Sequence, residues 1–443
     1  MLSRPVLVGA LILIGLASTI NCSYAWGLYY DTILGSPIVD KYANNNSTEL
    51  TLARIPAFSG STLVDLTEVI VNKLDNSIST RNISLLEMKE KVSTRVELEN
   101  PLVRGTAAAI VANISGDLTI DQICAIYDYI KFGNKTLNIT GWNYISEPVW
   151  LDVCTYANET LELGARTKHS GIGDCDDFAI LMASLVEAIG GTSKVILAYG
   201  NGSGHAFTEV YVGQIGINRI NNNNLITIDQ WLKQNYKTDE LLLRFDENTN
   251  EVWLNLDWGQ DENGDYHPGG PYTPLQHYLL VDIPKNGPKN AVQPPRNYIN
   301  SLEWNKKGND FQIAGKYDDA IRCYEEAIRL GPKYGAPWNN KAIAIYQNKL
   351  LTTSSLSFGT IPDLNQYVAI YKNKLPTTLS DYRVSDQDNY SSTLDCLNTS
   401  INLNPYLATA WYNKGLVLYL QGKYYNSEKC FEKGMCLAGQ LLG

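Results

Sequence analysis

Residues 172–191 read IGDCDDFAILMASLVEAIGG, and this stretch predicts one helix and one candidate reactive group. The apolar run after Asp177 and the closing pair of glycines predict a helix over residues 175–189 that ends at a glycine C-cap. Asp174 is the expected N-cap, and Asp177 three residues later completes an arrangement like a capping box. The first turn of this helix therefore holds one thiol, Cys175, among carboxylates.

The segments around this helix predict an α+β domain. An amphipathic helix is expected upstream, and the segments downstream alternate or run apolar and are rich in β-branched and aromatic residues, as strands are. The turn-forming sequence DENTNE between the last two strands predicts a hairpin. One helix followed by a run of strands favours an α+β domain over a doubly wound sheet. The upstream helix is LTIDQICAIYDYIKF (118–132), and the strands are SKVILAYG (193–200), HAFTEVYVG (205–213), ELLLRFD (240–246) and EVWLNLDW (251–258).

Cys175 needs a partner before it can act as a nucleophile. The positive end of the helix dipole favours a thiolate, whereas the neighbouring aspartates oppose it by like-charge repulsion, so a histidinium would be required. His205 is the candidate because it follows the flexible sequence GNGSG and opens a strand. Asp257, at the end of the strand VWLNLD, is suited to hold the imidazole in one tautomer. On spacing alone, separate structural roles for the three residues are the alternative.

Charge and composition exclude two classes of function. A net charge of −10 without clustered Lys or Arg argues against a nucleic-acid-binding surface. The four histidines and eight cysteines show no metal-ligand spacing, so no metal site and no cofactor is expected.

Residues 1–30 predict a signal peptide or a membrane anchor. After Arg4 no charged residue occurs before Asp31, and the run VLVGALILIGLASTI (6–20) is apolar behind a positive residue. The run is short for a spanning helix unless it extends toward Tyr30. Either interpretation places the rest of the chain outside the cytoplasm, secreted or anchored to the membrane.

The second half of the chain predicts a helical repeat domain at residues 301–439. It follows a Pro-, Asn- and Lys-rich linker at residues 284–300. One unit opens at Ser301, another at Ala408, and a middle unit is interrupted by an insert at about 350–388. Their large and small residues recur at the offsets of a tetratricopeptide repeat, in which large side chains of one helix fill notches left by small residues on the next. In the first unit these residues are Trp304, Gly308, Phe311, Gly315, Tyr317, Ala320, Tyr324, Ala327 and Pro332.

The sequences GDCDDFAILMASLVEAIGG, GHAFTEV and VWLNLDW together resemble the transglutaminase-like superfamily, over about residues 118–283. The upstream segment WNYISEP is similar to that family too. The resemblance implies a papain-like α+β core in which Cys175 is the nucleophile, His205 the general base and Asp257 the orienting acid. It is closest to exported archaeal members that carry C-terminal tetratricopeptide repeats. Residues 31–117 would form a helical and extended region before this catalytic domain.

The chain departs from the family pattern in two places. The Asn-rich insert INNNNLITIDQWLKQNY lengthens the gap between His205 and Asp257, which leaves Asp229 as an alternative acid. The side chain that stabilises the oxyanion is not identified by the sequence: Tyr156 is a weak match, and the backbone N–H of Cys175 would be the other donor.

The implied chemistry is acyl transfer from an amide through a thioester. Hydrolysis would make the protein a peptidase or amidase, which we favour, and an amine acceptor would make it a cross-linking transglutaminase. The alternative from another class is a non-catalytic scaffold that binds peptides or surface polymers. The expected partners are a peptide or protein substrate, a protein bound by the repeats, and a membrane if the N-terminal segment is not cleaved.

Overall fold

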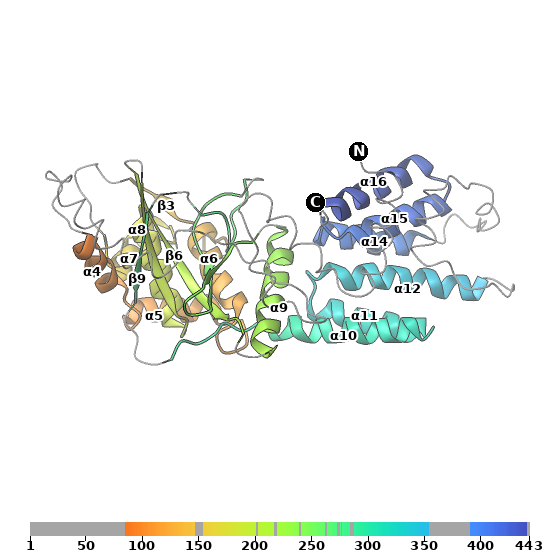
Figure 1. Cartoon of the computed structure of the whole chain (residues 1–443), viewed down its shortest axis with the longest axis horizontal. Coiled ribbons are helices and arrows are strands. Elements are labelled where there is room, and N and C mark those ends of the chain that lie inside the picture. The colour runs from red at the N-terminus through yellow and green to blue at the C-terminus, as the bar shows by residue number, and fades with distance from the viewer. Residues whose placement is uncertain are drawn as a thin grey trace. The chain divides into compact units, whose positions relative to one another are not determined.

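The computed structural model describes residues 85–146, 154–200, 203–216, 219–238, 241–261, 264–272, 275, 277–283, 288–353 and 390–440. The predicted signal peptide or anchor and nearly all of the predicted insert lie outside the described residues. The chain divides into two compact units, one built around a sheet and one built from the repeat helices together with a short stretch at residues 233–239 (Figure 1). In the described part of the chain, no helix combines the length and the apolar character needed to cross a bilayer.

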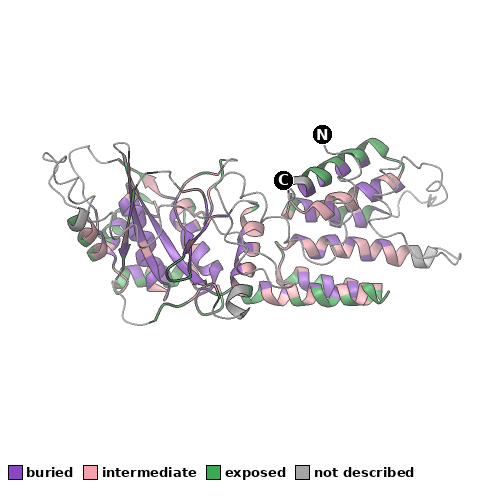
Figure 2. Cartoon of the chain, in the orientation of Figure 1, coloured by how far each residue is buried: buried purple, intermediate pink, exposed green. Residues whose placement is uncertain are grey.

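The first unit is a mixed α/β domain centred on an antiparallel sheet of five strands, in the order β7-β8-β6-β5-β9. Four of these strands match the predicted ones, and the fifth, β9, was not expected from the sequence. Buried residues are concentrated in the sheet and in α8, whereas the outer helices bury only part of their surface (Figure 2). The strands are β5 (Ser193–Gly200), β6 (Ser203–Gln214), β7 (Leu243–Asp246), β8 (Glu251–Asn255) and β9 (His277–Asp282).

Helix α8 (Cys175–Ala188) is the central helix of this unit, and it confirms the prediction from its sequence. It packs against β6 and β5 on one side, and helices α4, α5, α6 and α7 contact it on its others, which explains why residues 176–187 are all buried. The hydroxyl of Thr208 on β6 donates to the carbonyl of Ala179, 2.7 Å away, and so ties the sheet to the helix. The helix ends at Ala188 with Ile189 as its C-cap, and the chain turns away at Gly190, whose φ of +93° suits glycine.

The remaining helices of this unit are α4 (Leu85–Arg95), α5 (Pro101–Val111), α6 (Ile120–Phe132), α7 (Ala157–Thr167) and α9 (Arg219–Tyr236), of which the last four residues are assigned to the other unit. Two short strand pairs complete it: β1 (Gly133–Asn134) with β2 (Ile139–Thr140), and β3 (Asn143–Tyr144) with β4 (Ile172–Gly173). Helix α9 occupies the Asn-rich insert, where no helix was expected. Its buried apolar side chains are Leu225, Ile228 and Leu232, a helical spacing that the run of asparagines obscures.

Part of the predicted linker is packed rather than extended. Val292 is buried, and the neighbouring Gln293 exchanges backbone hydrogen bonds with Leu118 and Ile120 at the start of α6. Helix α10 then begins at Arg296, inside the range predicted as linker.

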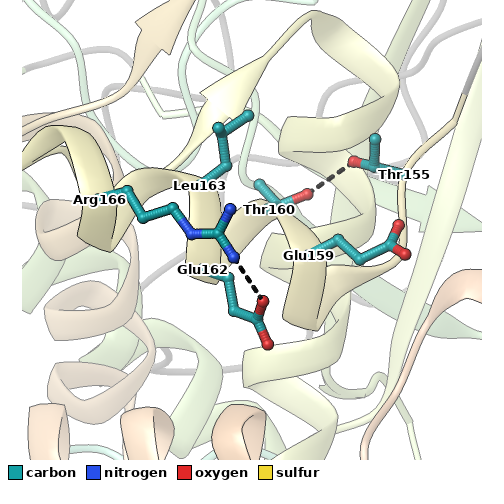
Figure 3. A pocket seen from close by; sticks show the side chains of 6 residues that line it. All are labelled: Thr155, Glu159, Thr160, Glu162, Leu163 and Arg166. Carbon is teal, nitrogen blue, oxygen red and sulfur yellow. Dashed lines mark hydrogen bonds and ion pairs between the residues drawn. The ribbon is translucent and has the colours of Figure 1, made fainter.

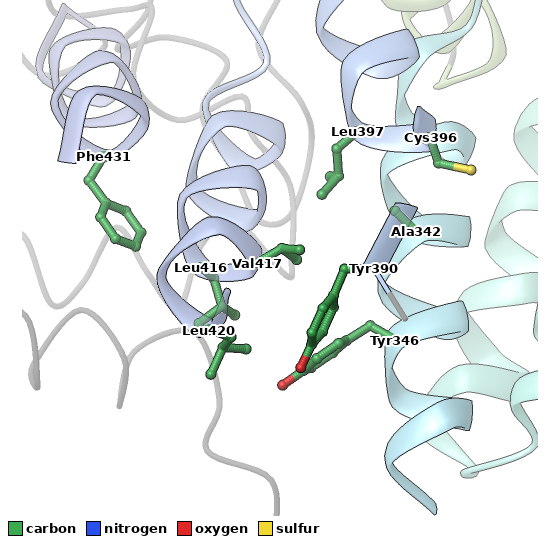
Figure 4. Close-up of a cluster of buried hydrophobic side chains, with 9 residues drawn as sticks. All are labelled: Ala342, Tyr346, Tyr390, Cys396, Leu397, Leu416, Val417, Leu420 and Phe431. Carbon is green, nitrogen blue, oxygen red and sulfur yellow. The ribbon is translucent and has the colours of Figure 1, made fainter. Parts of the chain in front are cut away.

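The second unit is the expected helical repeat region. Its helices are α10 (Arg296–Ile313), α11 (Tyr317–Leu330), α12 (Gly335–Thr353), α14 (Ser391–Leu403), α15 (Ala408–Leu420) and α16 (Tyr424–Gln440). Small residues accept large ones as predicted: a Cβ added to Gly308 would lie 2.4 Å from the Tyr324 ring, and one added to Gly415 would lie 2.9 Å from the Phe431 ring. One apolar cluster joins four of these helices (Figure 4). Its nine buried side chains come from α12, α14, α15 and α16 and from Tyr390, the residue before α14. The rings of Tyr346 and Tyr390 stack in this cluster with their centroids 6.0 Å apart.

Candidate active site

Cys175 is the first residue of α8, and the helix start around it is held by its aspartates. The carboxylate of Asp174 accepts from the N–H of Asp176, and the N–H of Asp174 donates to Asp177 Oδ2, both at 3.3 Å. This is the predicted capping box. Asp177 also accepts from the amide and hydroxyl of Thr155, at 2.8 and 2.5 Å. The aspartates thus have a structural role that fixes where the thiol lies.

The thiol meets strand β6 one residue after His205. The backbone N–H of Ala206 donates to the Cys175 sulfur. That amide is available because β8 pairs with β6 only from Glu209 onward, and among the described residues no strand is paired with the earlier part of that edge of β6. Cys175 and Ala206, which are 31 residues apart in the sequence, are brought into contact in this way.

His205 and Asp257 form a hydrogen-bonded pair. The Nε2 atom of His205 lies 2.8 Å from Asp257 Oδ2 and 3.0 Å from Oδ1. The carboxylate is fixed in turn, since Oδ1 accepts from the N–H of Trp258 at 2.7 Å, and the Asp257 amide donates to Asn255 Oδ1 at 2.9 Å. The side chain of Asp257 is 2 % exposed and that of His205 is 13 % exposed, so the pair is shielded while the ring keeps some access to solvent.

Strand order explains this meeting across a long gap in the sequence. Strands β6 and β8 are neighbours, so His205 near the start of β6 lies close to the residues that follow β8. Asp229, the alternative acid, lies instead on α9, within the excursion between β6 and β7. The carboxylate that contacts the histidine is that of Asp257.

Among the described residues, no hydrogen bond joins the Cys175 sulfur directly to the imidazole; the sulfur interacts instead with the Ala206 amide in this part of β6. Because Nε2 is engaged by Asp257, Nδ1 is the ring nitrogen left for a second partner. Catalytic hydrogen bonds are often long in the absence of substrate.

Electrostatics keep an isolated Cys175 thiol protonated. Burial raises its pKa to about 12, and the carboxylates of Asp174, Asp176 and Asp257 act in the same direction, while the Ala206 amide opposes them. Burial likewise raises the pKa of Asp176 to about 9, assisted by the hydrogen bond and negative charge of Asp174. A nucleophilic thiolate at neutral pH therefore requires a base, as the sequence indicated.

Tyr144 is a residue of this site that sequence reasoning missed. The parallel pairing of β3 with β4 sets Tyr144 opposite Gly173, two residues before Cys175. Burial raises the pKa of Tyr144, and the Cys175 thiol is among the acidic groups that add to the effect. A hydrogen bond from the Ser146 side chain to the phenol opposes this increase in pKa, and the only sequence signal for Tyr144 was the upstream segment WNYISEP.

Tyr156, the weak sequence candidate for an oxyanion donor, lies elsewhere. It precedes α7, its ring lies 5.1 Å from the guanidinium of Arg95, and 40 % of it is exposed. Among the described residues, no contact joins Tyr156 to Cys175.

Aromatic rings line the helix start on the side of Tyr144. The ring of Trp258, next to Asp257, lies 4.9 Å from those of Tyr144 and Phe178. The ring of Trp142 packs edge-on against Phe178 at 5.2 Å. These rings form one aromatic cluster beside the first turn of α8.

A separate hollow of about 260 Å³ lies over α7 (Figure 3). Figure 3 shows its charged residues on one helix, with Arg166 3.5 Å from Glu162, and Thr155 and Thr160 joined through their hydroxyls at 2.7 Å. Cys175 is not among the residues that line it, and no thiol or imidazole faces it, so we do not count it as part of the site.

Comparisons with known proteins match both units. The family model described as transglutaminase-like superfamily matches residues 104–233, a range that includes Cys175 and His205 and ends before Asp257. Two models of the tetratricopeptide repeat match residues 301–334 and 408–437.

The chain is also similar to an uncharacterized protein of Methanocaldococcus jannaschii, at 33 % identity over 58 residues, which is 13 % of this chain and 67 % of that protein. Among solved structures it is similar to the first tetratricopeptide domain of human RPAP3, at 19 % identity, covering 31 % of this chain and 78 % of that one, with a TM-score of 0.21. A tetratricopeptide protein of Thermus thermophilus matches at 19 % identity, covering 31 % and 74 % with a TM-score of 0.16. The chain therefore has a transglutaminase-like core domain at residues 104–233, followed by C-terminal tetratricopeptide repeats.

Proposed function

We propose that this protein is a cysteine-dependent acyl-transfer enzyme that hydrolyses peptide or amide bonds, with Cys175, His205 and Asp257 as its catalytic residues. The observation that carries the proposal is the His205–Asp257 hydrogen bond at 2.8 Å, formed one residue from the amide that contacts the Cys175 sulfur. The match to the transglutaminase-like superfamily supports amide chemistry in general, and the triad is our inference from the geometry.

Each residue has one role in this reaction. The imidazole Nδ1 accepts the proton of the Cys175 thiol, and the sulfur attacks the amide carbonyl to form a tetrahedral intermediate. The imidazolium then protonates the leaving amine, and a thioester remains on the sulfur. Water attacks the thioester with the neutral imidazole as base, which releases the acid and restores the thiol. Asp257 holds the ring through Nε2 and stabilises the imidazolium.

The oxyanion formed in both attacks needs donors in a site that excludes water. We propose the backbone N–H of Cys175, at the positive end of α8, as one donor, and the phenol of Tyr144, on the strand paired with the segment just before Cys175, as the other.

Alkylation of Cys175 by iodoacetamide across pH tests this proposal. A thiol with a pKa of about 12 and no partner is ionised at pH 7 to only about one part in 10⁵. If the thiol transfers its proton to His205, the rate of Cys175 alkylation should instead rise near neutral pH and then level off. Cys436, the exposed thiol on α16, is the internal reference, with each cysteine peptide quantified by mass spectrometry.

His205→Ala should lower the rate at pH 7 by about 100-fold, the usual size of a lost general base, and Asp257→Asn should lower it by less. The reference peptide should not change. The proposal fails if Cys175 reacts no faster than Cys436 near neutrality and His205→Ala leaves its rate unaltered.

The fate of the thioester on Cys175 distinguishes the hydrolase from a cross-linking transglutaminase and from a non-catalytic scaffold. A protein that accumulates labelled Cys175 from an activated ester and passes the acyl group to an added primary amine faster than to water is a cross-linking transglutaminase. A protein that binds peptides equally well before and after Cys175→Ala, and turns none over, is a scaffold.

We further propose that the repeats bind a protein partner and that the enzyme acts outside the cytoplasm. The three-unit helical array supports the first, and the apolar run at residues 6–20 behind Arg4 supports the second. Protection of Cys436 in intact cells from a thiol reagent that cannot cross membranes would contradict an extracytoplasmic location.

A further inference from the structure

A buried ion pair lies on the same face of strand β6 as His205. Residues at positions i, i+2 and i+4 of a strand share one face, so His205, Phe207 and Glu209 project to the same side of the sheet. Glu209 is 0 % exposed, and its partner Arg244 on β7 is 1 % exposed. Arg244 Nε lies 2.9 Å from both carboxylate oxygens, and Nη2 lies 2.6 Å from Oε2.

Tyr272 connects this pair to the histidine. Its hydroxyl donates to Glu209 Oε1 at 2.8 Å. Its ring meets Phe207 edge-on with centroids 5.4 Å apart, and Phe207 stacks against the His205 ring at 5.9 Å and 30°. The imidazole is therefore supported on one side by a row of rings that ends in a charged hydrogen bond, and held at Nε2 by Asp257.

The segment that carries Tyr272 is fixed to the same strand as the acid. Asn255, opposite Glu209 in the β6–β8 register, donates from Nδ2 to the carbonyl of Gly270 at 3.0 Å. Its Oδ1 accepts from the Asp257 amide. One buried amide thus sets the position of both the acid that binds the histidine and the loop that leads to Tyr272.

A buried ion pair adds little net stability, since an apolar pair of similar size often does as well. The pair instead fixes the orientation of the Tyr272 ring. A ring packed only by apolar contacts can tilt, whereas a phenol hydrogen-bonded to a fixed carboxylate cannot. We propose that Tyr272 is a positioning residue for His205, its hydroxyl held by the Glu209–Arg244 pair so that its ring, through Phe207, keeps the imidazole aligned between Asp257 and Cys175.

This inference rests on the proposed function, because it presumes that His205 activates the thiol. Tyr272→Phe is the sharpest test, since it removes one hydroxyl and keeps the ring. Tyr278→Phe is the matched control: Tyr278 packs in the same apolar cluster as Phe207, and its hydroxyl accepts from the amide of Leu275 instead of donating to Glu209.

In the full-length protein, Tyr272→Phe should lower the rate of Cys175 alkylation at pH 7 by about three- to tenfold, as expected for the loss of one hydrogen bond that aligns a base. The pH–rate profile should move toward alkaline pH, because the thiolate loses its imidazolium partner. Phe207→Leu, which cuts the same row of rings, should have a similar effect, and the double variant should be no worse than either single one because the two act in series.

The outcomes distinguish the two proposals. If His205→Ala slows alkylation but Tyr272→Phe behaves like Tyr278→Phe, the positioning role is wrong and the proposed function stands. If Tyr272→Phe lowers thermal stability with no change in the pH–rate profile, the hydroxyl is only structural and the inference is overturned. If His205→Ala has no effect on alkylation, both proposals fall.

Discussion

Replacing Arg244 by methionine should strongly destabilise the sheet unit. The substitution keeps a long unbranched side chain and removes all three contacts of 2.6–2.9 Å to Glu209. Glu209 would then be a carboxylate without a cation in a fully buried position, and the Tyr272 hydroxyl would be the side-chain donor left to it among the described residues. Breaking a buried pair in this way costs about 3–5 kcal/mol.

Hydrogen exchange measures this loss of stability in the sheet unit alone. The chain has two units, so a single unfolding midpoint would mix them, whereas the backbone amides of Val210 and Leu254 report on the β6–β8 pairing directly. A loss of about 3–5 kcal/mol should accelerate exchange at the slowest amides of these strands by about 10² to 10³-fold or more. Amides of the repeat helices should not change.

Two matched variants complete the experiment. Lys194→Met breaks an ion pair on the same sheet, Lys194 with Asp282 at 3.3 Å, but Asp282 is 68 % exposed, so this change should cost less than about 1 kcal/mol. Removing both buried charges, with Glu209→Leu and Arg244→Met together, should restore most of the stability. The reasoning is refuted if Arg244→Met exchanges no faster than Lys194→Met, or if the double variant is as unstable as the single one.

Two further predictions concern other parts of the chain. Gly308→Ala should destabilise the repeat unit by about 2 kcal/mol, because its Cβ would lie 2.4 Å from the Tyr324 ring. Gly105→Ala on α5, where an added Cβ would have nothing within 4 Å, should stabilise its helix by up to about 1 kcal/mol. Hydrogen exchange in each unit measures both effects. A stable Gly308→Ala would show that the two helices can separate at no cost. Asp176→Asn should raise the thermal stability of the sheet unit increasingly as pH rises from about 4 to 9. The pKa of Asp176 is about 9 in the folded state against an ordinary 3.8, so the wild-type carboxyl contributes stability that is full at low pH and is lost as pH rises through 9. Asparagine does not titrate, so the variant has no such dependence on pH. An identical stability difference at every pH would contradict this.

The sequence predicted those parts of the molecule whose contacts are local. The capping box at Asp174 and Asp177 is a matter of three residues, and the helix it starts was predicted to within one residue of its end. The notch that accepts Tyr324 at Gly308 follows from a repeat whose period is visible in the chain itself. Both depend on spacing along the backbone, which the sequence displays directly.

Features set by pairing between distant strands could not be predicted in the same way. The choice between Asp257 and Asp229 depends on β8, rather than α9, being the neighbour of β6, and no local pattern contains that information. Tyr144 reaches the helix start only through the two-residue pairing of β3 with β4, which is too short to leave a periodic signal. The partnership of Glu209 with Arg244 was hidden for a similar reason, because each residue alone looks like a surface charge in an amphipathic strand.

The adjacency of β6 and β8 also makes the segment between β6 and the β7–β8 hairpin replaceable. Whatever the chain does between Gln214 and Leu243, it must return to the same place in the sheet, so the length of that excursion can vary without moving the histidine, the acid or Arg244. A graft that shortens it to a tight connection, or inserts another module there, would leave the geometry around the sulfur unchanged. Kinship between such proteins is therefore better judged by which strands are neighbours than by how many residues separate two motifs.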